Sequence, residues 1–162
     1  MSDRTKWIAQ GGMIAAIYIV LVFLGDLAGL SSGVIQIRAA EALTILPYFS
    51  SAAVPGLFAG CFLGNLLTGC VIWDVVFGSL TTLAAAWLTR KLRKFSPFLA
   101  PVPPIILNML VVPLVLRYAY HLEDAWIFMV VTVGIGEVIS CGVLGMLLFF
   151  AIRHRKLEQY FV

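Results

Sequence analysis

Long apolar runs fill most of this chain, and short polar stretches separate them. The first run covers residues 7–24. Its roughly 18 residues match the thickness of one hydrocarbon layer at about 1.5 Å per helical residue. Residues 25–36 are rich in Gly, Asp and Ser, a composition typical of a loop. The pattern therefore predicts a series of membrane-spanning helices joined by short loops.

The stretch 39–70 allows two interpretations. Its only charged residue is Glu41, and it is interrupted by Pro47, Ser50 and Pro55. It is either one long kinked helix or two short helices.

The positions of the basic residues favour two helices. Nine of the eleven Lys and Arg residues then lie on one side of the membrane, which the positive-inside rule makes the cytoplasmic side. These nine are Arg4, Lys6, Arg90, Lys91, Arg93, Lys94, Arg153, Arg155 and Lys156. With a single helix, the cluster at 90–94 would lie outside.

The prediction is therefore an all-α membrane protein with six transmembrane helices and both termini in the cytoplasm. The whole chain, residues 1–162, forms one domain. The helices are expected at 7–24, 38–50, 53–70, 74–89, 101–116 and 125–152. The outer loops are then 25–36, 70–74 and 117–124.

Composition excludes a soluble domain, because 62% of the residues are hydrophobic and 12% are charged. Mean hydropathy is +1.03. The net charge of +3 needs no nucleic-acid partner, since membrane orientation explains where the basic residues fall. The three cysteines have no CxxC spacing and are interpreted as small packing residues. We expect a multi-pass protein of a prokaryotic plasma membrane, in contact with lipid.

Four polar side chains fall at membrane depth: Glu41, Asn65, Asn108 and Glu137. An ionisable group in this setting is a candidate functional residue, because burying a charge in lipid is costly. A structural alternative exists for Glu41, since Arg38 lies three residues earlier on the same helical face. The two amides can likewise bond only to neighbouring backbone.

Further polar and aromatic residues are expected at the outer membrane surface, notably Trp73, Asp74 and Trp126. Aromatic rings at this level form an interfacial belt in many membrane proteins, without any ligand. Their coincidence with polar residues on the same side also suits a planar solute, which needs stacking faces and directional hydrogen bonds.

Small residues are spaced for close helix contact. Gly56, Gly60 and Gly64 form a GxxxGxxxG ridge, which we expect to pack inside the molecule. The first helix carries two offset pairs of small residues, one of which is Gly12 and Ala16.

The chain lacks the common catalytic motifs, including HExxH, GxSxG and the Walker A lysine motif. We therefore expect no enzyme activity and no ATP hydrolysis by this chain. Six helices without a visible inverted repeat are also few for an independent alternating-access carrier. These features favour a solute-binding protein that depends on partners for energy.

Two segments carry a resemblance to a known family. IQIRAAEALTILPYFSSAAVPGLFAGCFLGNLL and the following IWDVVFGSLTTLAAAW resemble the queuosine-precursor transporter (QueT) family, whose members are substrate-binding S components of energy-coupling factor (ECF) importers. The sharpest part is the pattern IQ-x-R-xx-EALT-x-LP. The resemblance implies a six-helix S component that binds a 7-deazaguanine such as preQ1 or preQ0, or a related precursor such as queuine.

The resemblance also implies partners: a transmembrane scaffold subunit and two ATPase subunits, which hydrolyse the ATP, so that this chain needs no cofactor. In such proteins an AxxxA-type surface on the first helix meets the scaffold. Gly12, Ala16 and Val20 occupy that spacing here in a less strict form.

A guanine-like base matches the candidate residues chemically. Its N1–H and 2-amino edge presents two parallel donors to one carboxylate, and an aminomethyl group adds a cation for a second acid. Glu41 and Glu137 are the candidate acids, with Asp74 at the rim. Arg38, Asn65 or Asn108 can donate to the base, while Trp73 or Trp126 stacks on it.

Which acid takes which end stays open, and two other functions stay open with it. One is an S component for another vitamin, such as thiamine or riboflavin. The other is a non-transport membrane protein whose acids are structural.

Overall fold

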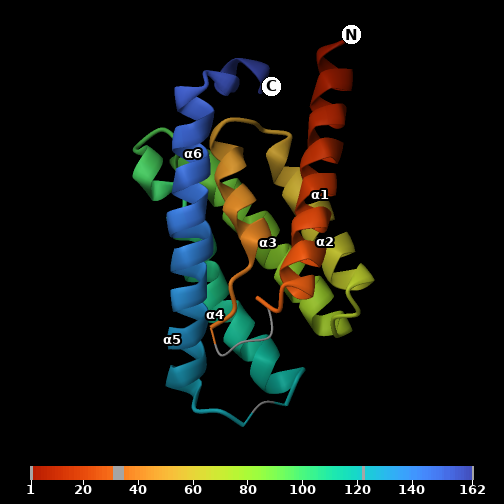
Figure 1. Cartoon of the computed structure of the whole chain (residues 1–162), viewed down its shortest axis with the longest axis vertical. Coiled ribbons are helices and arrows are strands. Elements are labelled where there is room, and N and C mark those ends of the chain that lie inside the picture. The colour runs from red at the N-terminus through yellow and green to blue at the C-terminus, as the bar shows by residue number, and fades with distance from the viewer. Residues whose placement is uncertain (1, 31–34, 122, 162) are drawn as a thin grey trace.

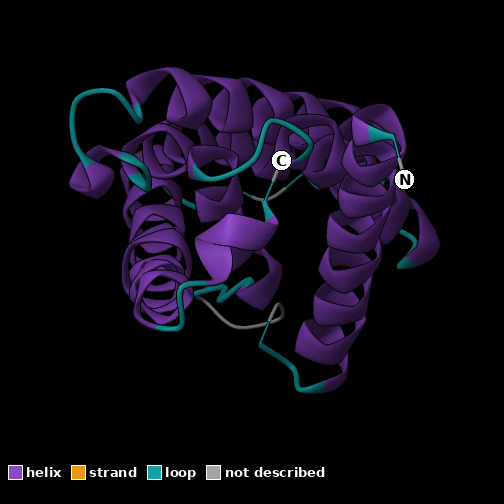
Figure 2. Ribbon diagram, turned by 90° about the horizontal axis from the view of Figure 1, so that it is seen from above, coloured by secondary structure: helices purple, strands orange, loops and turns teal. Residues whose placement is uncertain are grey.

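A computed structural model describes residues 2–30, 35–121 and 123–161 of the chain. Within these ranges every regular segment is helical and no strand occurs (Figure 2). The predicted loop residues 31–34 lie outside the described residues. The helical segments in chain order are α1 (Asp3–Leu27), η1 (Ala39–Tyr48), α2 (Ala53–Leu67), α3 (Ile72–Leu92), η2 (Pro97–Leu99), α4 (Val102–Tyr118), α5 (Trp126–Glu137), η3 (Val138–Leu144), α6 (Gly145–His154) and η4 (Leu157–Tyr160).

Of the prediction of six transmembrane helices, the number of helices is confirmed for the described residues, since α5, η3 and α6 form one continuous helix and η2 and η4 are short turns. The segments differ in length. Four are long and apolar enough to cross a membrane: Asp3–Leu27, Ile72–Leu92, Pro97–Tyr118 and Trp126–His154. The other two, η1 and α2, are shorter. The molecule is thus an all-helical, multi-pass membrane protein.

The second predicted helix is the one that differs most from expectation. Instead of an α-helix over 38–50, the structure has η1, a ten-residue 3-10 helix. At about 2.0 Å per residue, η1 is roughly 20 Å long, which is less than the hydrocarbon thickness of about 30 Å. Pro47 lies near its end and removes a backbone N–H donor.

Both chain ends lie at the same end of the bundle (Figure 1). There the amide of Gln10 donates to the backbone carbonyl of Tyr160 at 3.2 Å, which ties the first helix to the last turn. The Arg90 guanidinium reaches the Pro47 carbonyl at 3.2 Å. The arrangement agrees with an even number of passes.

Close packing of α1 against α2 depends on glycine. A Cβ added at Gly56 would lie 2.7 Å from the Gly11 carbonyl oxygen, and one at Gly60 would lie 3.1 Å from the Cα of Ala15. Gly64 faces Val22 of α1. The GxxxGxxxG ridge therefore packs inside the molecule, as predicted, because only hydrogen atoms leave room for the neighbouring backbone.

The short helix η1 lies in the interior. It packs against α1, α3, η3 and α6, and most of its residues are buried. Large apolar side chains on the outer helices, such as Val20, Phe77 and Leu147, are exposed instead. Their exposure is what a lipid-facing surface requires, whereas η1 carries Glu41 into the centre of the bundle.

Candidate functional site

A cavity of about 330 Å³ opens among α1, α2, α3 and the residues that precede η1. It lies towards the bundle end opposite the chain termini, where α1 ends and α3 begins (Figure 1). Its lining combines polar and apolar side chains from segments far apart in sequence: Tyr18, Leu21, Val22, Gly25, Asp26, Gln36, Arg38, Ala39, Ala40, Asn65, Thr68, Cys70, Asp74, Leu116 and Tyr120.

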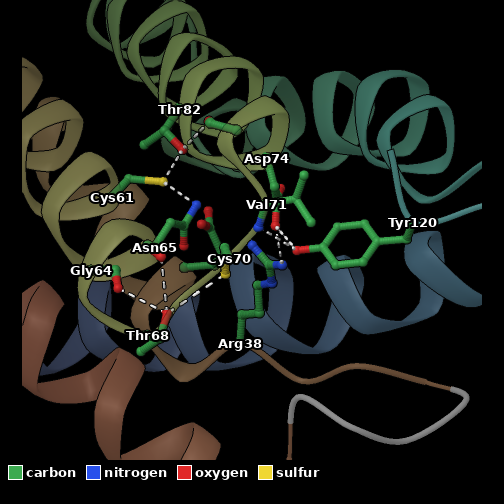
Figure 3. Close-up of polar contacts among 12 residues, drawn as sticks. Arg38, Cys61, Gly64, Asn65, Thr68, Cys70, Val71, Asp74, Thr82 and Tyr120 are labelled. Atoms are coloured by element: carbon green, nitrogen blue, oxygen red, sulfur yellow. Dashed lines mark hydrogen bonds and ion pairs between the residues drawn. The ribbon is translucent and has the colours of Figure 1, made fainter. Parts of the chain in front are cut away.

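One wall of the cavity is a polar group built from three segments. The Arg38 guanidinium lies 3.9 Å from the Asp74 carboxylate, which is buried at the start of α3. The Tyr120 hydroxyl donates to the same carboxylate at 3.2 Å and accepts from the Val71 N–H at 3.3 Å (Figure 3). Asp74 is therefore shared between a cation and a phenol at the cavity surface.

Tyr120 keeps its proton in this arrangement. Burial, together with the negative charge of Asp74, raises the pKa of Tyr120 to about 12. At neutral pH the hydroxyl is a donor, and it holds one carboxylate oxygen of Asp74 in place.

Asn65 lines the cavity from α2. Its amide nitrogen lies 3.7 Å from the Cys61 sulfur, which also accepts from the Thr82 hydroxyl at 3.4 Å (Figure 3). A sulfur atom is a weak acceptor, so much of the hydrogen-bonding capacity of the Asn65 amide is available to a ligand. The structure thus places an amide near the Asp74 carboxylate, since a Cβ added at Gly78 would lie 3.3 Å from Asn65 Nδ2 and 3.3 Å from Asp74 Oδ1.

Glu41 lies next to the cavity floor. The Tyr18 hydroxyl, from α1, donates to its Oε1 at 2.5 Å. Oε2 is buried and has no hydrogen-bond partner among the described residues. Arg38 makes its ion pair with Asp74, and no ion pair joins it to Glu41 in the described part of the chain. The structure therefore does not support the Arg38–Glu41 pair considered from sequence.

Glu137 completes an acidic cluster with Glu41. Cys141 lies one helical turn further on, and its thiol donates to Glu137 Oε2 at 3.2 Å. A possible metal-ligand atom can be chosen from each of three buried residues, Glu41, Glu137 and Cys141. These three atoms lie within 4.8 Å of one another. These three could also hold a metal ion. Asn108 lies beside both carboxyl groups.

A π-helical segment supports this cluster. Residues Val138–Leu144 widen the last long helix directly after Glu137, and π-turns often occur at functional sites. Within it, the Ser140 hydroxyl accepts from the Arg38 backbone N–H at 3.1 Å. This hydrogen bond joins the last long helix to the backbone segment that leads into η1.

The structure thus divides the predicted site residues into three groups. Arg38, Asn65 and Asp74 line the cavity, while Glu41, Asn108 and Glu137 lie together beside it. Trp73 and Trp126 do not line it. Trp73 is 56% exposed and stacks on Phe77, with ring centroids 5.9 Å apart.

The predicted docking residues lie elsewhere. Gly12, Ala16 and Val20 are all exposed on α1, on a face that does not contact α2. A Cβ added at Gly12 would meet nothing within 4 Å. This face is open to a partner, and its role stays a prediction.

Sequence reasoning missed five polar lining residues: Tyr18, Asp26, Gln36, Thr68 and Tyr120. A signal existed for Tyr18, because it follows Gly11 and Ala15 on the same helical face, the face that meets the glycine ridge of α2. Tyr120 lies in the predicted outer loop 117–124 but was not among the predicted site residues.

Comparisons with known proteins add an independent result. Residues 8–154 match the family described as QueT transporter. A relative from Lactococcus lactis subsp. cremoris (strain MG1363), named queuosine precursor transporter QueT, is 32% identical over 82 residues. That match covers 50% of this chain and 47% of the relative, so it spans about half the length of the curated protein. No solved structure matches the chain.

Proposed function

Since the chain belongs to the QueT transporter family, we propose that it is the substrate-binding S component of an ECF importer for a queuosine precursor. The observation that carries the proposal is the family match over residues 8–154, which covers nearly the whole chain. A transporter family agrees with the absence of catalytic motifs from the sequence, and we assign the protein no enzyme activity.

The cavity suits a ligand of this class. Its volume of about 330 Å³ lies at the lower end of the range of roughly 300–1,000 Å³ for small-molecule sites. A bicyclic base fits a small cavity better than a large vitamin does. The lining also supplies both donors and acceptors, which a guanine-like base requires on its two polar edges.

We assign the base-reading role to residues that face the cavity. Asp74 accepts the N1–H and 2-amino donors of the base, since its carboxylate offers two parallel acceptor oxygens. Arg38 and Asn65 donate to the carbonyl and ring nitrogen. We assign the aromatic contacts with the base to Tyr18 and Tyr120 instead of Trp73 and Trp126, because the two tyrosines line the cavity and the tryptophans do not.

Transport then depends on partners. We propose that the exposed face of α1 formed by Gly12, Ala16 and Val20 contacts the transmembrane scaffold subunit, and that two ATPase subunits supply the energy. The protein works in the plasma membrane of a prokaryote, with its chain ends and most basic residues in the cytoplasm.

The test is direct binding to the purified protein in detergent. Queuine and deazaguanines that carry an aminomethyl or a nitrile group are titrated in parallel with thiamine and riboflavin. We expect saturable binding of at least one queuosine precursor and none of the vitamins. If only thiamine or riboflavin bound, that vitamin would be the substrate and the proposed queuosine precursor would be wrong.

A matched pair of variants tests the assigned residues. Asp74→Asn replaces one acceptor by a donor that faces the base donors, so affinity should fall roughly tenfold to a hundredfold. Asp3→Asn removes the same charge from an exposed position in the first turn of α1 and should leave affinity unchanged. Equal affinities of the two variants would remove Asp74 from the site.

A further inference from the structure

Acidic groups outnumber basic ones around the cavity. Asp26 and Asp74 line it, Glu41 directly follows the lining residues Arg38, Ala39 and Ala40 in the chain, and Glu137 lies close to Glu41. Among the described residues of this region, Arg38 is the one basic side chain. Four acidic side chains thus face one basic side chain, and Arg38 is already paired with Asp74 at 3.9 Å. A ligand that brings a positive charge would reduce this imbalance.

Glu41 presents an acceptor atom without a donor. The residue is 2% exposed, and its Oε2 has no hydrogen-bond partner within the described residues. A buried polar atom without a partner destabilises a protein by about 1–3 kcal/mol, and more when it is charged. Such an atom in a candidate binding region points to a group that is supplied from outside the chain.

The acid pair is adjacent to the cavity. Tyr18 lines the cavity and donates to Glu41 Oε1 at 2.5 Å, so its side chain contacts both. Arg38, Ala39 and Ala40, which line the cavity, directly precede Glu41 in the chain. A substituent of a base held against Asp74 can therefore point toward the acid pair.

We infer that an ammonium group on the substrate binds between Glu41 and Glu137, which makes the protein selective for the aminomethyl-bearing deazaguanine over the uncharged nitrile compound. An ammonium group has three N–H donors and no acceptor, so it can serve Glu41 Oε2 and a Glu137 oxygen at once. Hydrogen bonds between ions of opposite charge are among the strongest in proteins. The inference rests on the proposed function and adds a site for the substituent of the base to the residues that bind the base itself.

The thiol in the cluster agrees with an organic cation better than with a metal ion. The Cys141 sulfur lies 3.2 Å from Glu137 Oε2 and 3.5 Å from the Glu41 carbonyl oxygen, and both contacts suit a thiol that donates. A metal ligand must be a thiolate instead. The thiol and the amide of Asn108 hold the Glu137 side chain, and Glu41 Oε2 has no hydrogen-bond partner within the described residues.

The experiment compares the aminomethyl and nitrile compounds on the same purified protein. Wild type should bind the aminomethyl compound at least tenfold more tightly. Glu137→Gln should lose most of this preference while its affinity for the nitrile compound stays within about threefold of wild type. Retained nitrile binding also shows that the variant is folded. Glu123→Gln is the matched control: it removes an exposed acid that does not line the cavity and should keep the preference.

The outcomes separate the inference from the proposed function. If wild type binds both compounds equally, or if Glu137→Gln keeps the preference, the inference is wrong and the proposed function stands. If neither compound nor queuine binds, the proposed function is wrong. Metal analysis completes the test, because a stoichiometric divalent ion that is lost in both Glu137→Gln and Cys141→Ser would assign the cluster to a metal and overturn the inference.

Discussion

At the scale of single residues, the hydrogen bond between Tyr18 and Glu41 joins the first helix to the buried 3-10 segment. It is 2.5 Å long and both side chains are almost fully buried. Glu41 Oε1 accepts from this hydroxyl, while Oε2 has no hydrogen-bond partner within the described residues. The stability of the empty protein should therefore depend on this hydroxyl group.

Tyr18→Phe tests this dependence. The variant leaves both carboxyl oxygens of Glu41 without that donor, so we expect the free energy of unfolding to fall by about 1–3 kcal/mol. Thermal unfolding of the ligand-free protein in detergent gives the measurement. Tyr118→Phe is the matched control, since Tyr118 is 71% exposed and its change should stay within about 0.5 kcal/mol. Equal melting temperatures of wild type and Tyr18→Phe would show that Glu41 accepts a hydrogen bond from another donor.

The sequence predicted candidate site residues but not which of them are neighbours. Glu41 and Glu137 stand out because charge is rare in an apolar run. Their proximity, and the pairing of Arg38 with Asp74, depend on how η1, α3 and α5 pack, which residue spacing along one helix does not encode. Tyr18 was missed because a tyrosine within an apolar run is equally typical of a lipid-facing helix.

At the scale of elements, the α1–α2 contact is set by glycine positions. Gly56 and Gly12 provide a comparison, because both lie within α-helices but only Gly56 faces a neighbouring backbone. Replacing glycine by alanine inside a helix usually stabilises it by up to about 1 kcal/mol. A close neighbouring backbone can outweigh this stabilisation, because the added Cβ then needs space that is already filled.

Gly56→Ala should be destabilising by about 1–3 kcal/mol, since its Cβ would lie 2.7 Å from the Gly11 carbonyl oxygen and the helices must separate. Gly12→Ala should be neutral or slightly stabilising, because nothing lies within 4 Å of its added Cβ. The melting temperature of Gly56→Ala should fall, while that of Gly12→Ala should stay unchanged or rise slightly. An unchanged or raised melting temperature of Gly56→Ala would mean that α1 and α2 adjust without strain.

The exposed face of α1 gives a second prediction at this scale. Ala16→Leu fills a small-residue face that points away from α2, so substrate binding by the isolated subunit should be unchanged. Uptake by the complete importer should fall at least severalfold, because close approach of the scaffold helix is lost. Binding assays and uptake assays are run on the same variant. If binding and uptake fall together, this face belongs to the internal packing instead.

At the scale of the whole molecule, the number and order of helical segments were predictable from sequence, because hydropathy and the distribution of basic residues determine them. The 3-10 geometry of η1 and the π-helical turn of η3 were not. Both depend on contacts with several neighbouring helices, and local apolar composition does not distinguish them from α-helix.

Orientation in the membrane is the prediction that belongs to this scale. A reporter fused after Lys94, or at the C-terminus, should be cytoplasmic, because the basic residues at these positions favour that side. Paired reporters that are active only inside or only outside the cell provide the measurement. An outside signal at either position would contradict the six-segment topology.

The shortness of η1 has a consequence for biosynthesis. A ten-residue segment that carries a carboxylate is a poor substrate for insertion into lipid as an independent helix. Its packing partners α3, η3 and α6 follow it in the chain and are therefore made later. We therefore expect η1 to reach its final position only after these segments have been made, and a nascent chain that lacks them to be a substrate for membrane proteases.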